Sequence, residues 1–289
     1  MPQSNSNSPI AWSSEPPKNL EILGIIAGSH SLPFVCAKEA RRLGIKKIVA
    51  VAFENETAPS LANEVDEIVW IKVGQLTKLI EAFTSRGVRH CIMAGQIAPR
   101  NLFDIRPDFK AVAMLFRLKE KNAHTVFNAI GEELLKDGVE LITALPWLQP
   151  NMPGLGFFLG PELTMVEQSD VKFGYNIAKE ISRLEIGQIV VVKDGTVLAV
   201  EGFEGTDRCL QRGGELAGKK GCAVAVKVAK PNHDLRFDLP CVGERTLQTC
   251  AEAGIRVLAL EANRTILLEQ ASVERLCHQS KITLVTVAH

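Results

Sequence analysis

Apolar runs alternate with stretches of helical periodicity along the first half of the chain. Strands are predicted where short apolar runs end in a turn signal, at residues 20–27, 45–53, 88–94 and 139–144. Helices are predicted where apolar residues recur three and four apart, at residues 33–43, 76–86, 108–117 and 123–136. Strands and helices that alternate in this way pair in parallel through right-handed crossovers, so this half predicts a Rossmann-like open sheet.

The second half repeats the alternation with a different beginning. An amphipathic helix at residues 166–184 precedes a hairpin, because two apolar runs flank Asp194-Gly195. Further elements are predicted as a short helix near 207–213, a strand at 222–229, a helix at 244–253, and strands at 256–261 and 282–287. We therefore predict an α/β fold in which the Rossmann-like sheet is joined by a linker to a second α/β domain. The active site is expected between the two domains, a common place for a ligand.

An uncharged run separates the two halves. Residues 141–161 are long enough to cross a bilayer, but they include four prolines and three glycines that would leave backbone groups of a spanning helix unpaired. We interpret this run as a linker. The predicted organisation is a disordered Ser-, Asn- and Pro-rich tail at 1–19, an N-terminal domain at 20–145, a linker at 146–163 and a C-terminal catalytic domain at 164–289.

Composition narrows the function classes. The 289 residues carry 33 basic and 33 acidic side chains, so there is no net charge that would favour nucleic acid. An acidic ligand must instead meet a local basic site. The 7 cysteines are odd in number and form no C-x-x-C pair, which is typical of reduced thiols in the cytoplasm. The tail lacks the apolar stretch of a signal peptide.

Two loops of the first domain are candidates for ligand binding. The small residues of the turn at 24–33 allow backbone amides to face a phosphate, and Glu54 follows the second strand where Rossmann domains often hold a ribose. The loop at 94–99 ends another strand and would face the same crevice. For the loop at 24–33 the alternative is a tight turn without a ligand, in which His30 is a turn residue. For the loop at 94–99 the alternative is an ordinary strand end without a ligand. The G-x-G-x-x-G fingerprint of NAD- and FAD-binding domains is absent.

Charged residues of the second domain follow two apolar runs. The loop before the short helix contains Glu204, Thr206 and Asp207, although Asp207 could simply complement the helix dipole. The segment at 227–240 combines Lys227, Lys230 and Arg236 with Asp234 and Asp238. Carboxylates beside basic groups suit metal-assisted chemistry on a phosphate ester, because Mg²⁺ takes one or two carboxylates plus phosphate oxygens. A solvated loop pair is the alternative for His233-Asp234.

Several motifs in one order make the chain recognisable from about residue 20 to its C-terminus. The motifs are G-I-I-A-G-x-x-x-L-P at 24–33, G-Q-L-x-x-L-I at 74–80, A-G-Q-I at 94–97, D-I-R-P-D at 104–108, I-G-Q-x-V-V-V-x-D-G-x-V-L-A-V-E at 186–201, E-G-T-D at 204–207, K-x-x-K-P at 227–231 and D-L-P-x-x-G at 238–243. With them the chain resembles the two-domain UDP-2,3-diacylglucosamine diphosphatases of lipid A biosynthesis.

The resemblance implies a magnesium-dependent hydrolase that cleaves UDP-2,3-diacylglucosamine to UMP and 2,3-diacylglucosamine 1-phosphate. It implies that Asp238 is essential, either as a metal ligand or to position the attacking water. Asp207 and Thr206 would hold the metal or the pyrophosphate, and Lys227 and Lys230 would take developing phosphate charge. The residues implied to line the nucleotide or diphosphate side are Gly28, Ser31, Gly95, Gln96 and Gln188.

Two positions depart from the family's pattern. Cys241-Val242 replaces Thr-Ile after the D-L-P motif, which removes a hydroxyl, and the first turn carries Ser29-His30-Ser31 in a glycine-rich stretch. Neither departure removes a charged group that the resemblance implies. The expected location is the cytoplasm, with peripheral contact at the inner membrane surface allowed by the lipid substrate.

Two rival interpretations remain. A non-catalytic protein that binds a nucleotide sugar or lipid would share a mixed pocket but would not need acids beside basic groups at the diphosphate. A nicotinamide-dependent oxidoreductase would explain the first domain alone, and the missing glycine fingerprint counts against it.

Overall fold

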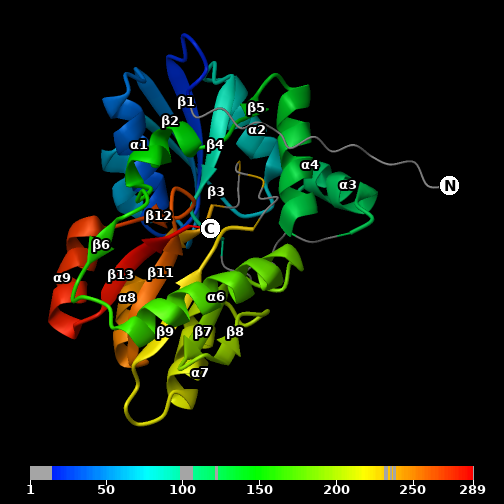
Figure 1. Cartoon of the computed structure of the whole chain (residues 1–289). Coiled ribbons are helices and arrows are strands. Elements are labelled where there is room, and N and C mark those ends of the chain that lie inside the picture. Colours follow the sequence, from blue (N-terminus) through cyan, green and yellow to red (C-terminus); the bar gives the residue numbers. More distant parts are fainter. Residues whose placement is uncertain are drawn as a thin grey trace. The chain divides into compact units, whose positions relative to one another are not determined.

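The computed structural model describes residues 15–97, 107–120, 123–230, 234, 236 and 239–288. The chain divides into two compact units (Figure 1). The first unit comprises Met1–Leu148 and Asp234–Asp238, and the second comprises Gln149–His233 and Leu239–His289. The predicted disordered tail lies outside the described residues as far as residue 14.

The first unit is built on one parallel sheet. Its strands are β1 (Ile22–Ala27), β2 (Lys47–Phe53), β3 (Glu67–Ile71), β4 (His90–Ala94) and β5 (Glu140–Leu141). They lie in the order β3-β2-β1-β4-β5, and every neighbouring pair is parallel. This is the strand order of a doubly wound sheet, with the first strand central and the chain reversing direction beside it. The predicted α/β class is confirmed.

Helices cover both faces of this sheet. They are α1 (Leu32–Arg42), the 3₁₀ turn η1 (Pro59–Asn63), α2 (Leu76–Thr84), α3 (Phe109–Arg117), α4 (Ala123–Lys136) and the short α5 (Leu145–Leu148). Apolar residues of α2, α3 and α4 pack on one face, and α1 lies on the other (Figure 1). Asp108 caps α3 by accepting the Ala111 N–H at 2.9 Å and also accepts the Thr77 N–H at 2.7 Å, which ties α2 to α3.

The second unit has a mixed sheet of six strands. The strands are β6 (Phe158–Leu159), β7 (Ile189–Lys193), β8 (Thr196–Val200), β9 (Ala223–Lys227), β11 (Ile255–Glu261) and β13 (Thr283–Val287), and a separate pair is formed by β10 (Cys241–Val242) and β12 (Ile266–Leu267). Their order is β6-β13-β11-β9-β7-β8. The three central strands β13, β11 and β9 are parallel, whereas β7 and β6 are antiparallel to their neighbours β9 and β13.

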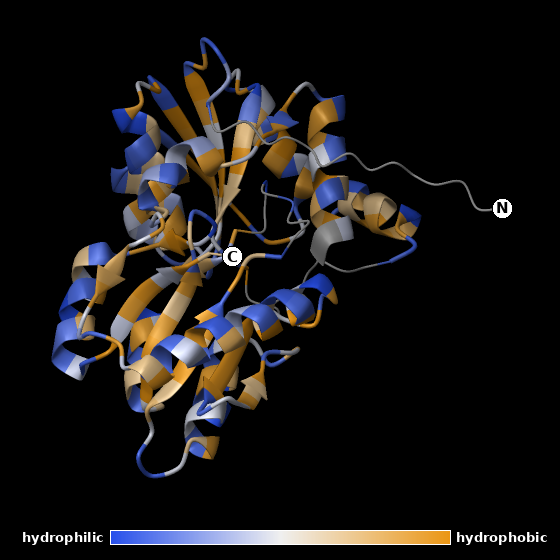
Figure 2. Cartoon of the chain, viewed as in Figure 1, coloured by the Kyte–Doolittle hydropathy of each residue, from blue (hydrophilic) through white to orange (hydrophobic). Residues whose placement is uncertain are grey.

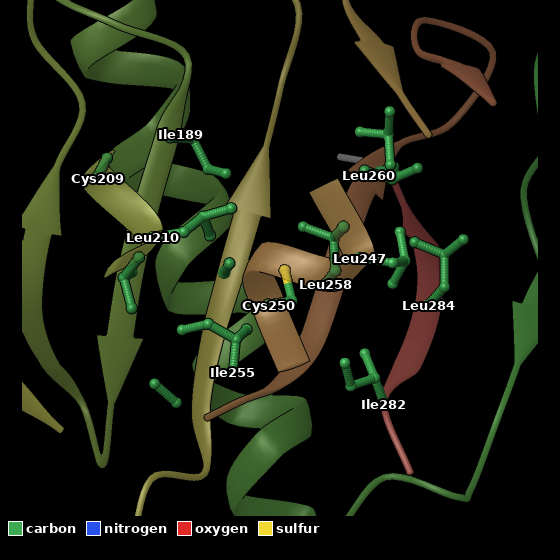
Figure 3. Close-up of a cluster of buried hydrophobic side chains, with 14 of the residues drawn as sticks. Ile189, Cys209, Leu210, Leu247, Cys250, Ile255, Leu258, Leu260, Ile282 and Leu284 are labelled. Carbon is green, nitrogen blue, oxygen red and sulfur yellow. The ribbon is translucent and has the colours of Figure 1, made fainter. Parts of the chain in front are cut away.

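Both faces of this second sheet are buried. Its helices are α6 (Met165–Arg183), α7 (Thr206–Leu216), α8 (Glu244–Glu252) and α9 (Gln270–Ser280), and the 3₁₀ turn η3 (Gln149–Asn151) begins the unit. Along β7, Ile189 and Val191 belong to the cluster that contains Leu210 of α7 and Leu247 of α8, and Figure 3 shows Ile189 in it. Val190 and Val192 pack with α6 on the other face. The strands therefore read as continuous apolar runs, orange in Figure 2, with the hydrophilic residues on the outer sides of the helices.

The β7–β8 hairpin is confirmed at its predicted turn. Asp194 and Gly195 both have positive φ, 49° and 72°, as a tight two-residue hairpin requires. Asp170 of α6 is 4% exposed and accepts the N–H groups of both turn residues at 2.8 Å. A buried carboxylate thus holds the turn end of the hairpin against α6.

The predicted linker contains regular structure. Trp147 and Leu148 of α5 are fully buried in the first unit, and Leu159 of β6 pairs with Leu284 of β13 in the second. Proline and glycine still prevent a long helix there, as the sequence indicates. Across the residues that the structure describes, every helix is too short or too polar to cross a bilayer.

Candidate functional site

The carboxyl ends of β1 and β4 carry the two predicted loops of the first unit. Their backbones bond directly: the Gly28 N–H donates to Ala94 O at 2.8 Å, and the Ser29 N–H donates to Gln96 O at 2.7 Å. The Ser29 hydroxyl donates to the same Gln96 oxygen at 2.6 Å. The two loops therefore form one continuous ridge at the edge where parallel sheets bind ligands.

Glycine is required where these loops meet. A Cβ on Gly28 would lie 2.7 Å from Gln96 O, and one on Gly95, whose φ is +91°, would lie 2.5 Å from Ser29 O. Close backbone approach therefore explains both glycines without a ligand. A ligand contact at either residue stays a prediction.

Ser31 occupies the N-cap of α1, but its side chain makes no capping hydrogen bond. Pro33 removes one of the amide donors that a helix N-terminus usually offers to an anion. Glu54 is exposed and donates its own N–H to Ile71 O, so only its side chain could reach a ribose. His30 has a φ of +67° and is exposed, as a turn residue would be.

Strand register gathers the predicted residues of the second unit at one edge of its sheet. Ile189 pairs with Lys227, and Lys227 pairs with Leu260, so the start of β7 lies beside the carboxyl ends of β9 and β11. Val190 pairs with Val200, which brings the end of β8 to the same edge. A single edge of the sheet therefore carries Gln188, Glu201, Lys227 and Glu261, which are far apart in the sequence.

Glu201 is a buried carboxylate at this edge and was not among the predicted site residues. Its side chain belongs to a residue that is 6% exposed. Oε1 accepts the Thr206 hydroxyl at 2.8 Å, and Oε2 accepts the Gln188 backbone N–H at 2.9 Å. One carboxylate thus holds two of the predicted residues. The available signal in the sequence was an acid that directly ends an apolar strand.

The side chain of Gln188 has an unsatisfied acceptor. Its Oε1 is buried and has no hydrogen-bond partner among the described residues. Buried polar atoms are nearly always paired, so an unpaired one indicates a place for a ligand or a water. This observation favours the predicted contact between Gln188 and the substrate.

Thr206 and Asp207 begin α7, after Gly205 with a φ of +83°. Asp207 Oδ2 forms an ion pair with Arg245 of α8 at 2.7 Å, while Oδ1 has no partner among the described residues. Arg245 was not predicted as part of this edge. The carboxylate is thus partly committed to a structural contact between α7 and α8, as well as to the helix N-terminus.

Lys227 is 6% exposed, and its Nζ donates to Cys241 O at 2.9 Å. This bond ties the end of β9 to β10 through the backbone of residue 241, so the Thr-to-Cys departure leaves it intact. Lys230 is half-buried and makes no ion pair with another described residue. Among the described residues, Lys230 therefore has no carboxylate that would compete with a phosphate, whereas Lys227 already donates to a carbonyl. The phosphate contacts of both lysines stay predictions.

A second buried carboxylate supports the loop after β9. Glu261, 8% exposed, accepts the Ala229 N–H at 2.8 Å and the Lys179 ammonium at 2.9 Å. The Tyr175 hydroxyl lies 3.5 Å from the same carboxylate. Burial and the neighbouring Glu261 charge raise the pKa of Tyr175. This network fixes the backbone immediately before Lys230.

The predicted essential residue, Asp238, lies outside the described residues. Two neighbours are described and belong to the first unit: Asp234 pairs with Arg236 at 2.6 Å, and Arg236 also donates to Asn128 of α4. Asp234 is therefore occupied by an ion pair. The pairing between His233 and Asp234 considered from the sequence lies partly outside the described residues.

The described residues alone provide few ligands for a metal ion. No group of three or more His, Cys, Asp or Glu side chains gathers in the described part of the chain. Magnesium needs fewer protein ligands than zinc, since it keeps waters and phosphate oxygens. The Asp207 carboxylate is a hard oxygen ligand of the kind that magnesium takes, but one described carboxylate does not make a site, so magnesium binding stays a prediction.

Four buried thiols are poor nucleophiles. Burial raises the pKa of Cys209 and of Cys250 to about 12, raises that of Cys277 to about 11, and raises that of Cys91 further. Thiols with such values stay protonated at neutral pH. Five of the seven cysteines are buried, as small apolar residues would be: Cys36, Cys91, Cys209, Cys250 and Cys277.

A hollow lies at the other edge of the second sheet. It has a volume of about 410 Å³ and is lined by Lys219, Lys220, Glu252 and Arg256, among others. Arg256 already bonds Thr283 at 2.9 Å and lies 3.8 Å from Glu167. The amino ends of parallel strands seldom carry the ligand site of such sheets, and no predicted residue lies there.

Models of the LpxI N-terminal domain and the LpxI C-terminal domain match residues 22–150 and 155–285. A protein of Caulobacter vibrioides named UDP-2,3-diacylglucosamine pyrophosphatase LpxI is 28% identical over 260 residues, which cover 87% of this chain and 92% of the relative.

Two solved structures are distantly similar to the chain. The biotin carboxylase domain of a thermophilic 2-oxoglutarate carboxylase matches with a TM-score of 0.25 and 16% identity, over 59% of this chain and 34% of that one. N5-carboxyaminoimidazole ribonucleotide synthetase from Thermotoga maritima matches with a TM-score of 0.23 and 14% identity, over 64% of this chain and 42% of that one. The chain thus spans less than half of either structure, and the scores are too low to indicate a shared fold.

Proposed function

Because the chain belongs to the LpxI family, we propose that it hydrolyses the pyrophosphate bond of UDP-2,3-diacylglucosamine, giving UMP and 2,3-diacylglucosamine 1-phosphate. The proposal rests on the match of both family domains together with the name of the Caulobacter relative. The gathering of Gln188, Thr206, Asp207 and Lys227 at one edge of the second sheet is the structural observation that supports it.

The chemistry requires little more than positioned water and stabilised charge. Hydrolysis of a phosphoric anhydride proceeds with negative charge spread over the phosphate oxygens. The ammonium groups of Lys230 and Lys227 would stabilise that charge. Asp238 would position or deprotonate the attacking water, and Gly28, Ser31, Gly95 and Gln96 would line the nucleotide or diphosphate.

Magnesium dependence is part of the proposal. Asp207, through Oδ1, and Asp238 are the carboxylates that would hold the ion. Bound magnesium would neutralise charge on the diphosphate. Release of UMP at an undiminished rate in excess EDTA would remove the metal from the proposal.

The bond that breaks defines the products. Water attacks the phosphorus on the sugar side, so the new P–O bond forms on the lipid phosphate and UMP leaves with the bridging oxygen. One water proton is released to a base or to solvent. Hydrolysis in ¹⁸O-water should place the label in 2,3-diacylglucosamine 1-phosphate, and label in UMP would contradict the proposed direction of attack.

An assay of purified protein with UDP-2,3-diacylglucosamine tests the activity itself. We expect equal amounts of UMP and lipid phosphate, whereas binding without UMP release would favour the non-catalytic alternative. Asp238→Ala should abolish turnover and keep the native melting temperature. Asp234→Asn is a matched change four residues earlier and should keep most of the activity. An Asp238→Ala variant with near-normal activity would exclude Asp238 from the mechanism.

The substrate is a lipid, so the proposal includes peripheral contact with the inner membrane surface. Flotation of the protein with vesicles that contain the substrate tests this contact. Vesicles without the substrate are the control, because they separate recognition of the lipid substrate from general adsorption.

A further inference from the structure

We infer that Glu201 is a positioning residue that presents the side-chain oxygens of Thr206 and Gln188 as hydrogen-bond acceptors for donors on the ligand. The inference rests on the proposed function and concerns how the same site recognises its ligand. The ligand groups that fit are hydroxyl or amide N–H groups of a sugar or nucleoside. Phosphate oxygens do not fit, so in this inference Thr206 does not hold the pyrophosphate, which is one of the roles that the resemblance implies for it.

The first step concerns the Thr206 proton. A hydroxyl has one proton to donate, and Thr206 donates it to Glu201 Oε1 at 2.8 Å. Its oxygen then faces its surroundings with lone pairs only. A phosphate oxygen is also an acceptor, so contact between the two would be repulsive, whereas an N–H or O–H of the ligand would be attracted.

The second step concerns Gln188. Glu201 Oε2 accepts the Gln188 backbone N–H at 2.9 Å, and the Gln188 carbonyl accepts the Val228 N–H at 2.9 Å. The backbone of Gln188 is therefore held on both sides. Its side-chain Oε1 is buried with no partner among the described residues, so it too lacks a donor. Leaving such an acceptor unpaired is costly, and a ligand donor would remove that cost.

The Glu201 carboxylate forms no ion pair with another described residue. It is 6% exposed, and its contacts in the described part of the chain are these two donors. A carboxylate at this position fixes the direction of both hydrogen bonds, because it can only accept. Glutamine could keep both contacts, but its amide nitrogen would donate to Thr206 and turn the hydroxyl proton toward the ligand.

Glu201→Gln is therefore the informative variant. It keeps shape and burial, so the melting temperature should stay within a few degrees of the native protein, while kcat/KM for UDP-2,3-diacylglucosamine should fall about 10- to 100-fold through misdirected polar contacts. The Thr206→Val substitution should lower kcat/KM by a similar factor, and Thr206→Ser should lower it by less than about threefold. Because Glu201 acts through Thr206, the double variant Glu201→Gln/Thr206→Val should be little worse than Thr206→Val alone.

Asp170 provides a matched control in the same hairpin. It is another buried carboxylate that accepts two N–H groups, at the turn end instead of the open end. Asp170→Asn should lower the melting temperature and leave kcat/KM unchanged. If Glu201→Gln behaves like Asp170→Asn, Glu201 is merely structural and the inference is wrong.

Equilibrium binding of each product, which does not depend on turnover, shows whether the hydrogen-bond donor belongs to the nucleoside or to the glucosamine. Weaker binding of UMP to Glu201→Gln would assign the acceptors to the nucleoside, and weaker binding of 2,3-diacylglucosamine 1-phosphate would assign them to the glucosamine. A loss confined to Mn²⁺ binding, or no loss, would overturn the inference. Failure of the native protein to release UMP would instead count against the proposed function, while these binding results still decide the role of Glu201.

Discussion

The carboxyl edges of the two sheets are held together by different chemical groups. In the first unit the β1 and β4 loops meet through backbone hydrogen bonds, and Gly28 and Gly95 allow the approach. In the second unit, buried carboxylates hold the edge: Glu201 fixes the open end of a hairpin, and Glu261 fixes the loop before Lys230.

The difference indicates a division of roles. The first edge consists of backbone and glycine with few ionisable groups, so it can fit the shape of a nucleotide but contributes little charge. Lysines and carboxylates whose positions are fixed by buried hydrogen bonds offer charge in a defined place, which suits reaction at a diphosphate. We therefore expect substitutions in the first edge to act mainly on folding and those in the second mainly on turnover.

The largest effect is expected at Gly95. Gly95→Ala combines a φ of +91° with a Cβ 2.5 Å from Ser29 O, so the two loops must separate. We expect a loss of about 3 kcal/mol in the free energy of unfolding, measured by urea denaturation. Gly44→Ala is the control, because Gly44 has the same φ of +91° but no atom within 4 Å of the added Cβ. It should cost only about 1 kcal/mol. Equal losses would show that backbone strain, and not the contact between loops, requires Gly95.

The next effect tests the second edge. Lys227→Met keeps most of the aliphatic stem but removes the donor to Cys241 O. The unpaired carbonyl should cost about 1–2 kcal/mol of stability. If Lys227 binds the diphosphate as proposed, kcat/KM should also fall by about 100-fold or more. Lys230→Met should lower kcat/KM with little change in stability. A Lys227→Met variant that loses stability alone would place Lys227 with the structural residues of the first edge.

A smaller effect on stability is expected from substitution of Glu133, a charged residue of the first unit. Glu133 of α4 accepts from Lys136 at 2.7 Å and from Arg117 of α3 at 2.5 Å. Hydrogen bonds from Lys136 and then Arg117 outweigh desolvation and hold the pKa of Glu133 below its usual value. A lowered pKa contributes stability above the unfolded-state value, and this stability is lost as the pH falls through the folded-state value.

Glu133→Gln should therefore cost about 1 kcal/mol at pH 7, because both cations are more than half exposed. The cost should shrink as the pH falls through the lowered folded-state pKa of Glu133, because the native carboxyl is then protonated as well. Urea denaturation at several pH values measures this, with kcat/KM at pH 7 expected to stay unchanged. A cost that persists at low pH would mean that packing, and not charge, is responsible.

The smallest effect is expected at Ser29. Its hydroxyl adds a bond of 2.6 Å to Gln96 O, but its N–H already donates to the same oxygen at 2.7 Å. Ser29→Ala should cost about 0.5 kcal/mol or less and leave kcat/KM within about twofold of the native value. A large loss of activity would give the first edge a chemical role and weaken the contrast with Thr206.

Much of the fold could be predicted from periodicity and turn signals. The hairpin at Asp194-Gly195 and the helix at α4 are located as predicted. The edge strand β3 was not predicted, and Ile71 is the one buried residue among its five. Helix α9 was missed as well, since only Val273 and Cys277 of its eleven residues are buried and its apolar stripe is weak.

The candidate site could be predicted only as a set of side chains. Motifs that carry Thr206, Asp207 and Lys227 are visible in the sequence, but the partners of these residues are not. Glu201 ends a strand in the sequence like many acids, and nothing local indicates that its two oxygens bond Gln188 and Thr206. Arg245 is one residue of α8 with no special spacing, yet it pairs with Asp207.

By itself the sequence determined the α/β class, most of the elements, the order of the family motifs and the candidate residues, because hydrophobic period and turn chemistry are local properties of the chain. The tertiary structure decided which of these residues share an edge. The antiparallel placement of β7 beside β9 brings Gln188 to Lys227, and the hairpin then returns Glu201 to the same place. Strand register depends on packing against both faces of the whole sheet, which no short segment encodes.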